Sequence, residues 1–258
     1  MKRGSLTVVG TGIQAGVQTT AQAVAFIEHC EEVLYLVTDP LAGRWIESVN
    51  PRARALDELY HPTGPRADSY ARIVEEIARP VRAGRDVCVA FYGHPGVFVR
   101  PAHEAIRVLR TEGFRATMLP AVSAEDCLFA DLGVDPGRLG CQSYEATDFL
   151  IRRRSPDPQA ALILWQLSVL GRLDSVTTPD TSRLPFLVEH LLRFYPGEHE
   201  VVLYEASPYP AVGPAVERVA LSALPDAGVA GMTTLYLAPT ATPEVDLELV
   251  RRLGMDWP

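Results

Sequence analysis

The feature that most constrains the fold is the regular alternation of short apolar runs with amphipathic helical stretches up to Pro120. A β-branched run such as Leu6–Val9, stopping at a glycine, is typical of a buried parallel strand. In Ser69–Ala83 the apolar side chains fall on one helical stripe. Because neighbouring parallel strands need crossover connections, the pattern predicts an α/β fold. The expected strands are 6–9, 32–37, 86–92 and 115–119, and the expected helices are 19–29, 69–83 and 101–112. After the second strand, Asp39 is suited to cap a helix with Pro40 at its first position.

A second lobe is expected to begin after Pro120, which divides the chain into domains 1–120 and 121–258. The connection Ser168–Pro185 is long, polar and without a clear period, and such loops are usually functional or poorly ordered. The expected strands of this lobe are 160–165, 200–206 and 232–238, and the expected helices are 123–132 and 244–253.

Composition excludes several classes of protein. The formal net charge of -8 disfavours a broad surface for nucleic acid or anionic membranes. The cysteine spacings match no metal site or disulfide framework, and Cys30, Cys88 and Cys127 are expected to be buried, reduced thiols. No apolar run approaches the roughly 18 residues of a membrane span, and the N-terminus resembles a strand rather than a signal peptide. We therefore expect a soluble cytoplasmic protein without a metal.

The first candidate for chemistry is the glycine turn after the first strand, formed by Gly10, Gly12 and Gly16. Glycines there allow a tight turn and close approach of a ligand. Asp39 ends the second strand, so a nicotinamide-dependent oxidoreductase is one interpretation. Gln14 and Ala15 do not continue into a clear helix, which counts against it. A purely structural turn is the other interpretation.

The second candidate is Phe91–Phe98, a turn with two glycines and a proline at the end of a strand. Ligands of open α/β sheets bind at this edge, and Tyr92 and Phe98 offer aromatic faces to a cation or a purine. A turn with two aromatic side chains packed beneath it is the structural alternative.

The third candidate is the set Tyr60, Arg66 and Tyr70. Arg66 lies just before the helix expected from Ser69, and Tyr70 lies in its first turn, so two phenols and a guanidinium can converge without a metal. An arginine offers five directed donors and suits an oxygen that gains negative charge. From the residues alone, a structural loop with core tyrosines is the simpler interpretation.

Together these blocks resemble the tetrapyrrole methylase superfamily, and within it the borosin peptide α-N-methyltransferases, which methylate backbone amides of a ribosomal precursor peptide. The matching segments occur in order along nearly the whole chain. They are the GTG turn, VTDP (37–40), the Tyr60/Arg66/Tyr70 spacing, FYGHPGVFV (91–99), EGFRATMLPAVSAEDCLFADLG (112–133), Trp165-Gln166 and GMTTLYLAP (231–239).

The resemblance implies a two-lobed α/β fold, with a mostly parallel N-terminal sheet, a mixed C-terminal sheet and S-adenosylmethionine in the cleft between them. It also implies that Tyr60, Arg66 and Tyr70 line the reaction centre and are catalytic. As a hypothesis from their chemistry, Arg66 and Tyr70 hold the amide oxygen and Tyr60 takes the proton. The residues implied for S-adenosylmethionine are Tyr92, His94, Val97, Phe98, Ser123, Ala124, Gln166, Thr233 and Thr234. Ser123 and Ala124 are expected to act through backbone groups, and Gln166 has a purely structural alternative.

By the same resemblance we expect a homodimer. The fungal borosin enzymes carry their substrate peptide after the methylase domain, whereas this sequence ends at Pro258, so we expect a split-type member whose precursor is a separate protein. A methyltransferase acting on a tetrapyrrole ring carbon stays open as an alternative, as does a non-catalytic module that only binds the cofactor.

Overall fold

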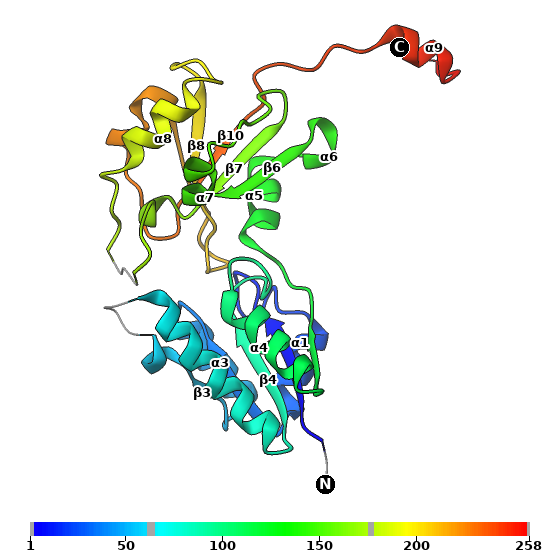
Figure 1. Cartoon of the computed structure of the whole chain (residues 1–258), viewed down its shortest axis with the longest axis vertical. Helices are drawn as coiled ribbons and strands as arrows, with labels where there is room; N and C mark the ends of the chain where they lie inside the picture. The colour runs from blue at the N-terminus through cyan, green and yellow to red at the C-terminus, as the bar shows by residue number, and fades with distance from the viewer. Residues whose placement is uncertain (1–2, 61–64, 175–177, 257–258) are drawn as a thin grey trace. The chain divides into compact units, whose positions relative to one another are not determined.

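The computed structural model describes residues 3–60, 65–174 and 178–256 (Figure 1). The chain forms two compact units, and each unit is built from three separate segments of the sequence. Unit 1 comprises Met1–Val134, Arg172–Thr178 and Glu205–Ala215, and unit 2 comprises Asp135–Gly171, Pro179–Tyr204 and Val216–Pro258. The main division thus follows Val134 rather than Pro120, and two later segments return to unit 1, which a single boundary in the sequence could not represent.

Unit 1 contains a five-stranded sheet in the order β3-β2-β4-β1-β5, and every neighbouring pair is parallel. This is the expected parallel α/β arrangement. Its strands are β1 (Ser5–Gly10), β2 (Glu32–Leu36), β3 (Arg54–Ala55), β4 (Asp86–Phe91) and β5 (Arg115–Met118). Its helices are α1 (Ala21–His29), α2 (Pro40–Val49), α3 (Arg66–Arg82), α4 (Arg100–Thr111) and α5 (Ala124–Leu132), with the 3-10 turn η1 (Asp57–Leu59).

Strand alternation divides the core of unit 1 between the two faces of the sheet. On β4, Val89 packs in a cluster with α3 and α4 side chains such as Ile77 and Leu109. Its neighbour Cys88 packs with Ile27 of α1 and Ile46 of α2. Both faces of the sheet are therefore covered, which leaves the strand ends as the places where loops can present chemistry.

Local signals explain most helix starts of unit 1. The Asp39 side chain accepts a hydrogen bond from the Leu41 N–H at 2.8 Å, and Pro40 occupies the first turn, as its sequence position predicts. Helix α3 begins at Arg66 instead of Ser69, and Pro65 provides no side-chain cap. The first N–H of α3 instead reaches the Leu173 carbonyl at 3.3 Å. This contact is remote in sequence, so no local signal could reveal it.

Unit 2 contains a second five-stranded sheet in the order β6-β7-β10-β8-β9, which is mixed. β6 is parallel to β7, whereas β10 runs antiparallel to both β7 and β8. Its strands are β6 (Cys141–Glu145), β7 (Ala161–Trp165), β8 (Glu200–Glu205), β9 (Ala215–Ala220) and β10 (Thr234–Leu237). The other elements are α6 (Pro136–Leu139), α7 (Ala146–Ile151), α8 (Leu184–Leu191), α9 (Leu247–Arg252), η2 (Leu167–Val169) and η3 (Leu221–Asp226).

The buried strands of unit 2 match the expected apolar runs, but the outer strands β6 and β9 were not expected. Their side chains are half-buried or exposed, so they lack the apolar pattern of central strands. The cysteines also differ in part from expectation: Cys30 and Cys88 are buried, whereas Cys127 is only half-buried. In the described residues no helix combines the length and apolarity needed to cross a bilayer.

Candidate active site

The structure brings Tyr60, Arg66 and Tyr70 together at the N-terminal end of α3. Arg66 is the first residue of the helix and Tyr70 lies one turn further, so both side chains share a face. Tyr60 closes the η1 turn, and its ring centroid lies 6.3 Å from that of Tyr70. The Tyr70 hydroxyl interacts with both the Tyr60 phenol and the Arg66 guanidinium. Residues 61–64, which connect Tyr60 to α3, lie outside the described part of the chain.

The electrostatics of this triad favour a neutral Tyr70. Burial raises the pKa of its phenol, and Tyr60 raises it further, while the Arg66 charge opposes part of the shift. Tyr70 therefore keeps its proton near neutral pH and can donate a hydrogen bond. The Nε of Arg66 is buried and has no hydrogen-bond partner among the described residues. An unpaired donor on a buried guanidinium is costly, and a substrate oxygen would satisfy it.

Sequence reasoning missed the segment Arg172–Asp174, which we call the Arg66 clip. It forms an antiparallel bridge with Pro65 through Asp174, and the Asp174 carbonyl accepts a hydrogen bond from Arg66 Nη2 at 3.2 Å. Arg172 donates two hydrogen bonds to the Asp174 carboxylate, from Nε at 2.9 Å and from Nη2 at 2.6 Å. The only hint in the sequence was the long polar connection 168–185, which carries no signal for its target.

The expected cofactor residues Tyr92, His94, Val97 and Phe98 lie in the turn that follows β4 in unit 1. The His94 Nδ1 accepts the Gly96 N–H at 3.0 Å, which fixes the imidazole within the turn. Phe98 has a φ of 56° and is 46% exposed, so an aromatic ring is displayed on strained backbone. The Tyr92 pKa rises to about 12, mainly through burial and then through nearby acidic groups, so its phenol is neutral.

Ser123 and Ala124 begin α5, and the structure assigns Ser123 a capping role. Its hydroxyl accepts the Asp126 N–H at 3.2 Å, and its own N–H donates to the Asp126 carboxylate at 2.7 Å. This reciprocal pair is a capping box. The Ser123 N–H is therefore already engaged, whereas Ala124 follows it in the first turn of the helix.

The other three expected cofactor residues lie in unit 2, where they share one end of the sheet. Gln166 directly follows β7 and has a φ of 63°, and Thr234 opens β10. The antiparallel register that pairs Leu235 with Leu164 places Thr233 at the same end as Gln166. The Thr233 hydroxyl accepts the Ala230 N–H at 2.8 Å. Each unit thus gathers its own share of the expected residues at strand ends.

The first glycine turn has a packing role. A Cβ on Gly10 would lie 2.1 Å from the Gly93 carbonyl oxygen, and one on Gly16 would lie 2.7 Å from Trp45 Nε1. Helix α1 begins only at Ala21, so no helix opens on the turn toward a pyrophosphate group. This geometry argues against the nicotinamide interpretation and favours the structural one.

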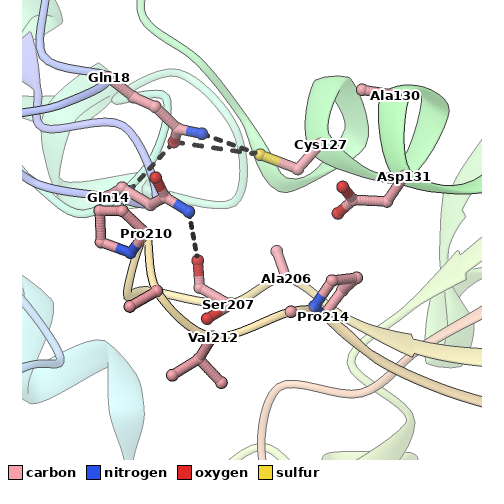
Figure 2. A pocket seen from close by; sticks show the side chains of 12 residues that line it. Gln14, Gln18, Cys127, Ala130, Asp131, Ala206, Ser207, Pro210, Val212 and Pro214 are labelled. Atoms are coloured by element: carbon pink, nitrogen blue, oxygen red, sulfur yellow. Dashed lines mark hydrogen bonds between the residues drawn. The ribbon is translucent and has the colours of Figure 1, made fainter.

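Figure 2 shows a pocket in unit 1 that is lined by α5, the loop 13–18 and the segment 206–214. Its volume is about 350 Å³. The Gln18 side chain accepts hydrogen bonds from the N–H groups of Ile13 and Gln14, and Gln14 Nε2 donates to the Ser207 carbonyl at 3.3 Å. None of the catalytic or cofactor-binding residues expected from the sequence lines this pocket. Its lining is Gln14, Gln18, Cys127, Ala130, Asp131, Ala206, Ser207, Pro210, Ala211, Val212, Gly213 and Pro214.

Within the described residues no group of three or more His, Cys, Asp or Glu side chains is arranged to hold a metal ion. The polar groups that the structure gathers in unit 1 are the guanidinium of Arg66 and the phenols of Tyr60 and Tyr70.

A sequence profile gives the class of protein that this fold and these residues define. The profile of the tetrapyrrole (corrin/porphyrin) methylases matches residues 5–222, and the chain belongs to this family.

Curated relatives place it near the borosin enzymes within that class. The chain is 42% identical, over 98% of its length, to the methyltransferase and omphalotin A precursor of Omphalotus olearius, and 40% identical to the gymnopeptide counterpart of Gymnopus fusipes. It spans only 62% and 61% of those two proteins. A type I borosin precursor of Coprinopsis marcescibilis is 39% identical, with 98% of this chain and 68% of that protein covered. In each of these relatives, methyltransferase and peptide precursor are named as one protein.

Solved structures agree on the fold. The uroporphyrin-III C-methyltransferase of Thermus thermophilus matches with a TM-score of 0.63 at 23% identity, covering 99% of this chain and 98% of that one. A structure of the Thermus enzyme with S-adenosylhomocysteine matches with a TM-score of 0.62 at 17% identity, covering 91% of this chain and 92% of that one. The expected two-sheet methylase fold is confirmed.

Proposed function

We propose that this protein uses S-adenosylmethionine to methylate backbone amide nitrogens of a ribosomal precursor peptide. The observation that carries the proposal is the buried Arg66 Nε, which lies near two phenols and has no hydrogen-bond partner in the described part of the chain, together with about 40% identity to borosin methyltransferases. A peptide nitrogen is a poor nucleophile because its lone pair is delocalised into the carbonyl. A site for this reaction must therefore stabilise negative charge on the carbonyl oxygen as the N–H proton leaves.

The residues that would hold the cofactor fit a ligand with a purine and a sulfonium. Phe98 and Val97 are partly exposed apolar side chains on a turn fixed by His94, and aromatic faces attract cations. The other residues that we propose for the cofactor, from the resemblance, are Ala124, Gln166, Thr233 and Thr234. Ser123 fits less well, because its N–H serves the capping box. When bound, S-adenosylmethionine supplies an activated methyl group.

In the mechanism that we propose, the chain's own residues make the amide nucleophilic. Arg66 directs its free Nε at the substrate carbonyl oxygen, and the neutral Tyr70 donates a second hydrogen bond to that oxygen. The raised Tyr70 pKa supports this division of roles, because a phenol that keeps its proton is a donor and not a base. Tyr60 then takes the amide proton as its phenolate, directly or through water, and loses that proton to solvent before the next turnover.

The proposal extends to partners. We propose that the protein is a homodimer and that its precursor is a separate polypeptide, although the curated relatives combine enzyme and precursor in one chain. Both points are open to direct measurement. Light scattering on the purified protein gives its subunit number. A precursor peptide added in trans gains methyl groups if the separate-precursor proposal holds, whereas methylation confined to a covalent fusion contradicts it.

The central test compares Arg66→Ala with the parent protein, using S-adenosylmethionine and a precursor peptide and reading methylation by intact and fragment-ion mass spectrometry. Removing an oxyanion donor lowers turnover about 100- to 1000-fold in other enzymes, and we expect a loss in that range. Cofactor affinity, measured by calorimetry, should change little. Arg72→Ala is the matched control, because Arg72 lies on the exposed side of α3 and its Nε donates to the Asp68 carbonyl of the same helix. Normal turnover by Arg66→Ala would end the assignment.

The alternatives have less support. A tetrapyrrole C-methyltransferase shares the fold, but the structures that suggest it are below 25% identity, whereas the similar sequences are peptide methyltransferases. The two functions separate in one assay, because the methyl groups appear either on peptide backbone nitrogen or on a macrocycle. Tight cofactor binding with no transfer to either substrate would favour a non-catalytic module.

A further inference from the structure

The Arg66 clip places a carboxylate close to the guanidinium that we assign to the substrate oxygen. Asp174 accepts a hydrogen bond from Arg66 Nη2 through its backbone carbonyl, not through its side chain. The Asp174 side chain nevertheless feels the Arg66 charge, which helps to lower its pKa to about 2, after the larger effect of Arg172. Because Arg66 Nη2 lies 3.2 Å from the Asp174 carbonyl oxygen, the Asp174 carboxylate belongs to a residue in direct contact with Arg66, and a change of its rotamer can bring it onto the guanidinium.

Such a contact would compete with the substrate. Arginine and carboxylate form strong bidentate pairs, and an ion-paired Arg66 would have its charge compensated within the protein. Arg172 already makes the bidentate contact, with Nε on one Asp174 oxygen and Nη2 on the other. Its side chain is 28% exposed, so the pair sits at the edge of the site and not in the core.

We propose that Arg172 is a positioning residue that holds the Asp174 carboxylate away from Arg66, so that the Arg66 charge stays available to the substrate carbonyl oxygen. This inference rests on the proposed role of Arg66 and deepens it. It predicts that, when Arg172 is removed, the Asp174 carboxylate pairs with Arg66 and lowers the rate. If the Arg172–Asp174 ion pair served only to stabilise the loop, removing both residues would be at least as harmful as removing Arg172 alone.

A double-substitution experiment separates these two roles. We expect Arg172→Ala to lower kcat about tenfold to a hundredfold, a part of the loss expected for a missing oxyanion donor, with KM for S-adenosylmethionine unchanged. Arg172→Ala combined with Asp174→Ala should recover most of that rate, because the competing carboxylate is gone while the backbone carbonyl remains. A double variant as slow as Arg172→Ala would overturn the proposal, and so would an Arg172→Ala enzyme with normal kcat.

The control is Arg183→Ala, which breaks an ion pair with Asp180 at 2.7 Å in the same long connection. Arg183 also donates to the Leu170 carbonyl at 3.4 Å, and neither of these partners belongs to the clip. It should keep normal kcat, and thermal unfolding of every variant checks that the fold is intact. Arg172→Lys should act as a partial rescue, because lysine keeps the charge but lacks the fork.

One readout does not depend on turnover. In a crystal structure of Arg172→Ala, the Asp174 carboxylate should lie within hydrogen-bond distance of the Arg66 guanidinium. A carboxylate that stays turned away contradicts the inference, whatever the substrate is. If instead the carboxylate collapses onto Arg66 but Arg66→Ala turns over normally, the clip proposal stands as geometry and the proposed function fails.

Discussion

Two glycine-bearing turns of unit 1 follow neighbouring parallel strands, yet they serve different purposes. The turn after β1 is joined to the turn after β4 by paired hydrogen bonds between Gly12 and Gly93, of 3.3 and 3.0 Å. In the first turn, atoms of the second turn occupy the space that a Cβ on Gly10 would need. In the second turn, Val97 and Phe98 remain exposed. The glycine-rich pattern looked alike in both, but the close contact of Gly10 is with the protein's own second turn, whereas the second turn itself presents Val97 and Phe98 at the surface.

The difference shows how a glycine motif should be interpreted. A glycine at the end of a strand indicates that another group lies close to its backbone. In the turn after β1, that group is the protein's own Gly93 carbonyl. The second turn carries its information in the residues around the glycines, namely a histidine that accepts a backbone N–H and an aromatic residue with positive φ. The comparison makes distinct predictions for the two turns.

The largest effect is expected for Gly10→Ala. Its Cβ would fall 2.1 Å from the Gly93 carbonyl oxygen and 2.6 Å from the Ala121 Cβ, so backbone must move. Overpacking of this kind costs about 3 kcal/mol, and urea denaturation should show a loss of unfolding free energy of that order. Gly213→Ala is the control, because nothing lies within 4 Å of its Cβ position. If Gly10→Ala is as stable as the parent but loses cofactor affinity, the packing assignment is wrong.

A smaller effect is expected at the start of α5, where a cap and a ligand contact are competing interpretations of Ser123. Ser123→Ala removes the hydroxyl that accepts the Asp126 N–H, and loss of an N-cap costs about 1 kcal/mol. We expect that loss in thermal or urea unfolding, with cofactor affinity unchanged in calorimetry. If the Kd for S-adenosylmethionine rises tenfold while the stability is unchanged, the Ser123 side chain contacts the cofactor.

The sequence predicted the elements whose signals are local. The parallel strands appear as apolar runs that end at glycine or a polar residue, and Asp39-Pro40 marked the start of α2 because cap and first turn are adjacent in the chain. Outer strands such as β6 were missed because a half-buried face has no continuous apolar run.

The site was predictable only in part, for the same reason. Tyr60, Arg66 and Tyr70 are close in sequence, and α3 places the last two one turn apart, so their convergence followed from spacing. Arg172 and Asp174 reach Arg66 from far along the chain, and the pocket beside α5 combines the loop 13–18 with the segment 206–214. Such contacts depend on tertiary packing, which hydrophobic period and capping patterns do not encode.

The smallest and most discriminating prediction concerns Phe98, which should lose binding with little change in stability when it becomes glycine. Its φ of 56° is a conformation that glycine adopts without strain, so relief of that strain should stabilise the fold by about 1 kcal/mol. Glycine also gives the unfolded chain more freedom and removes a partly covered ring with its contact, so the free energy of unfolding should change by less than about 1 kcal/mol in urea unfolding. Cofactor affinity should fall about tenfold, since loss of an aromatic face to a cation costs about 1–2 kcal/mol when the contact is desolvated. Arg153→Gly is the matched control, because Arg153 also has positive φ, at 50°, but lies outside the proposed site. It should gain stability without a change in binding, and a Phe98→Gly protein that binds normally would show that the strained ring serves only the turn.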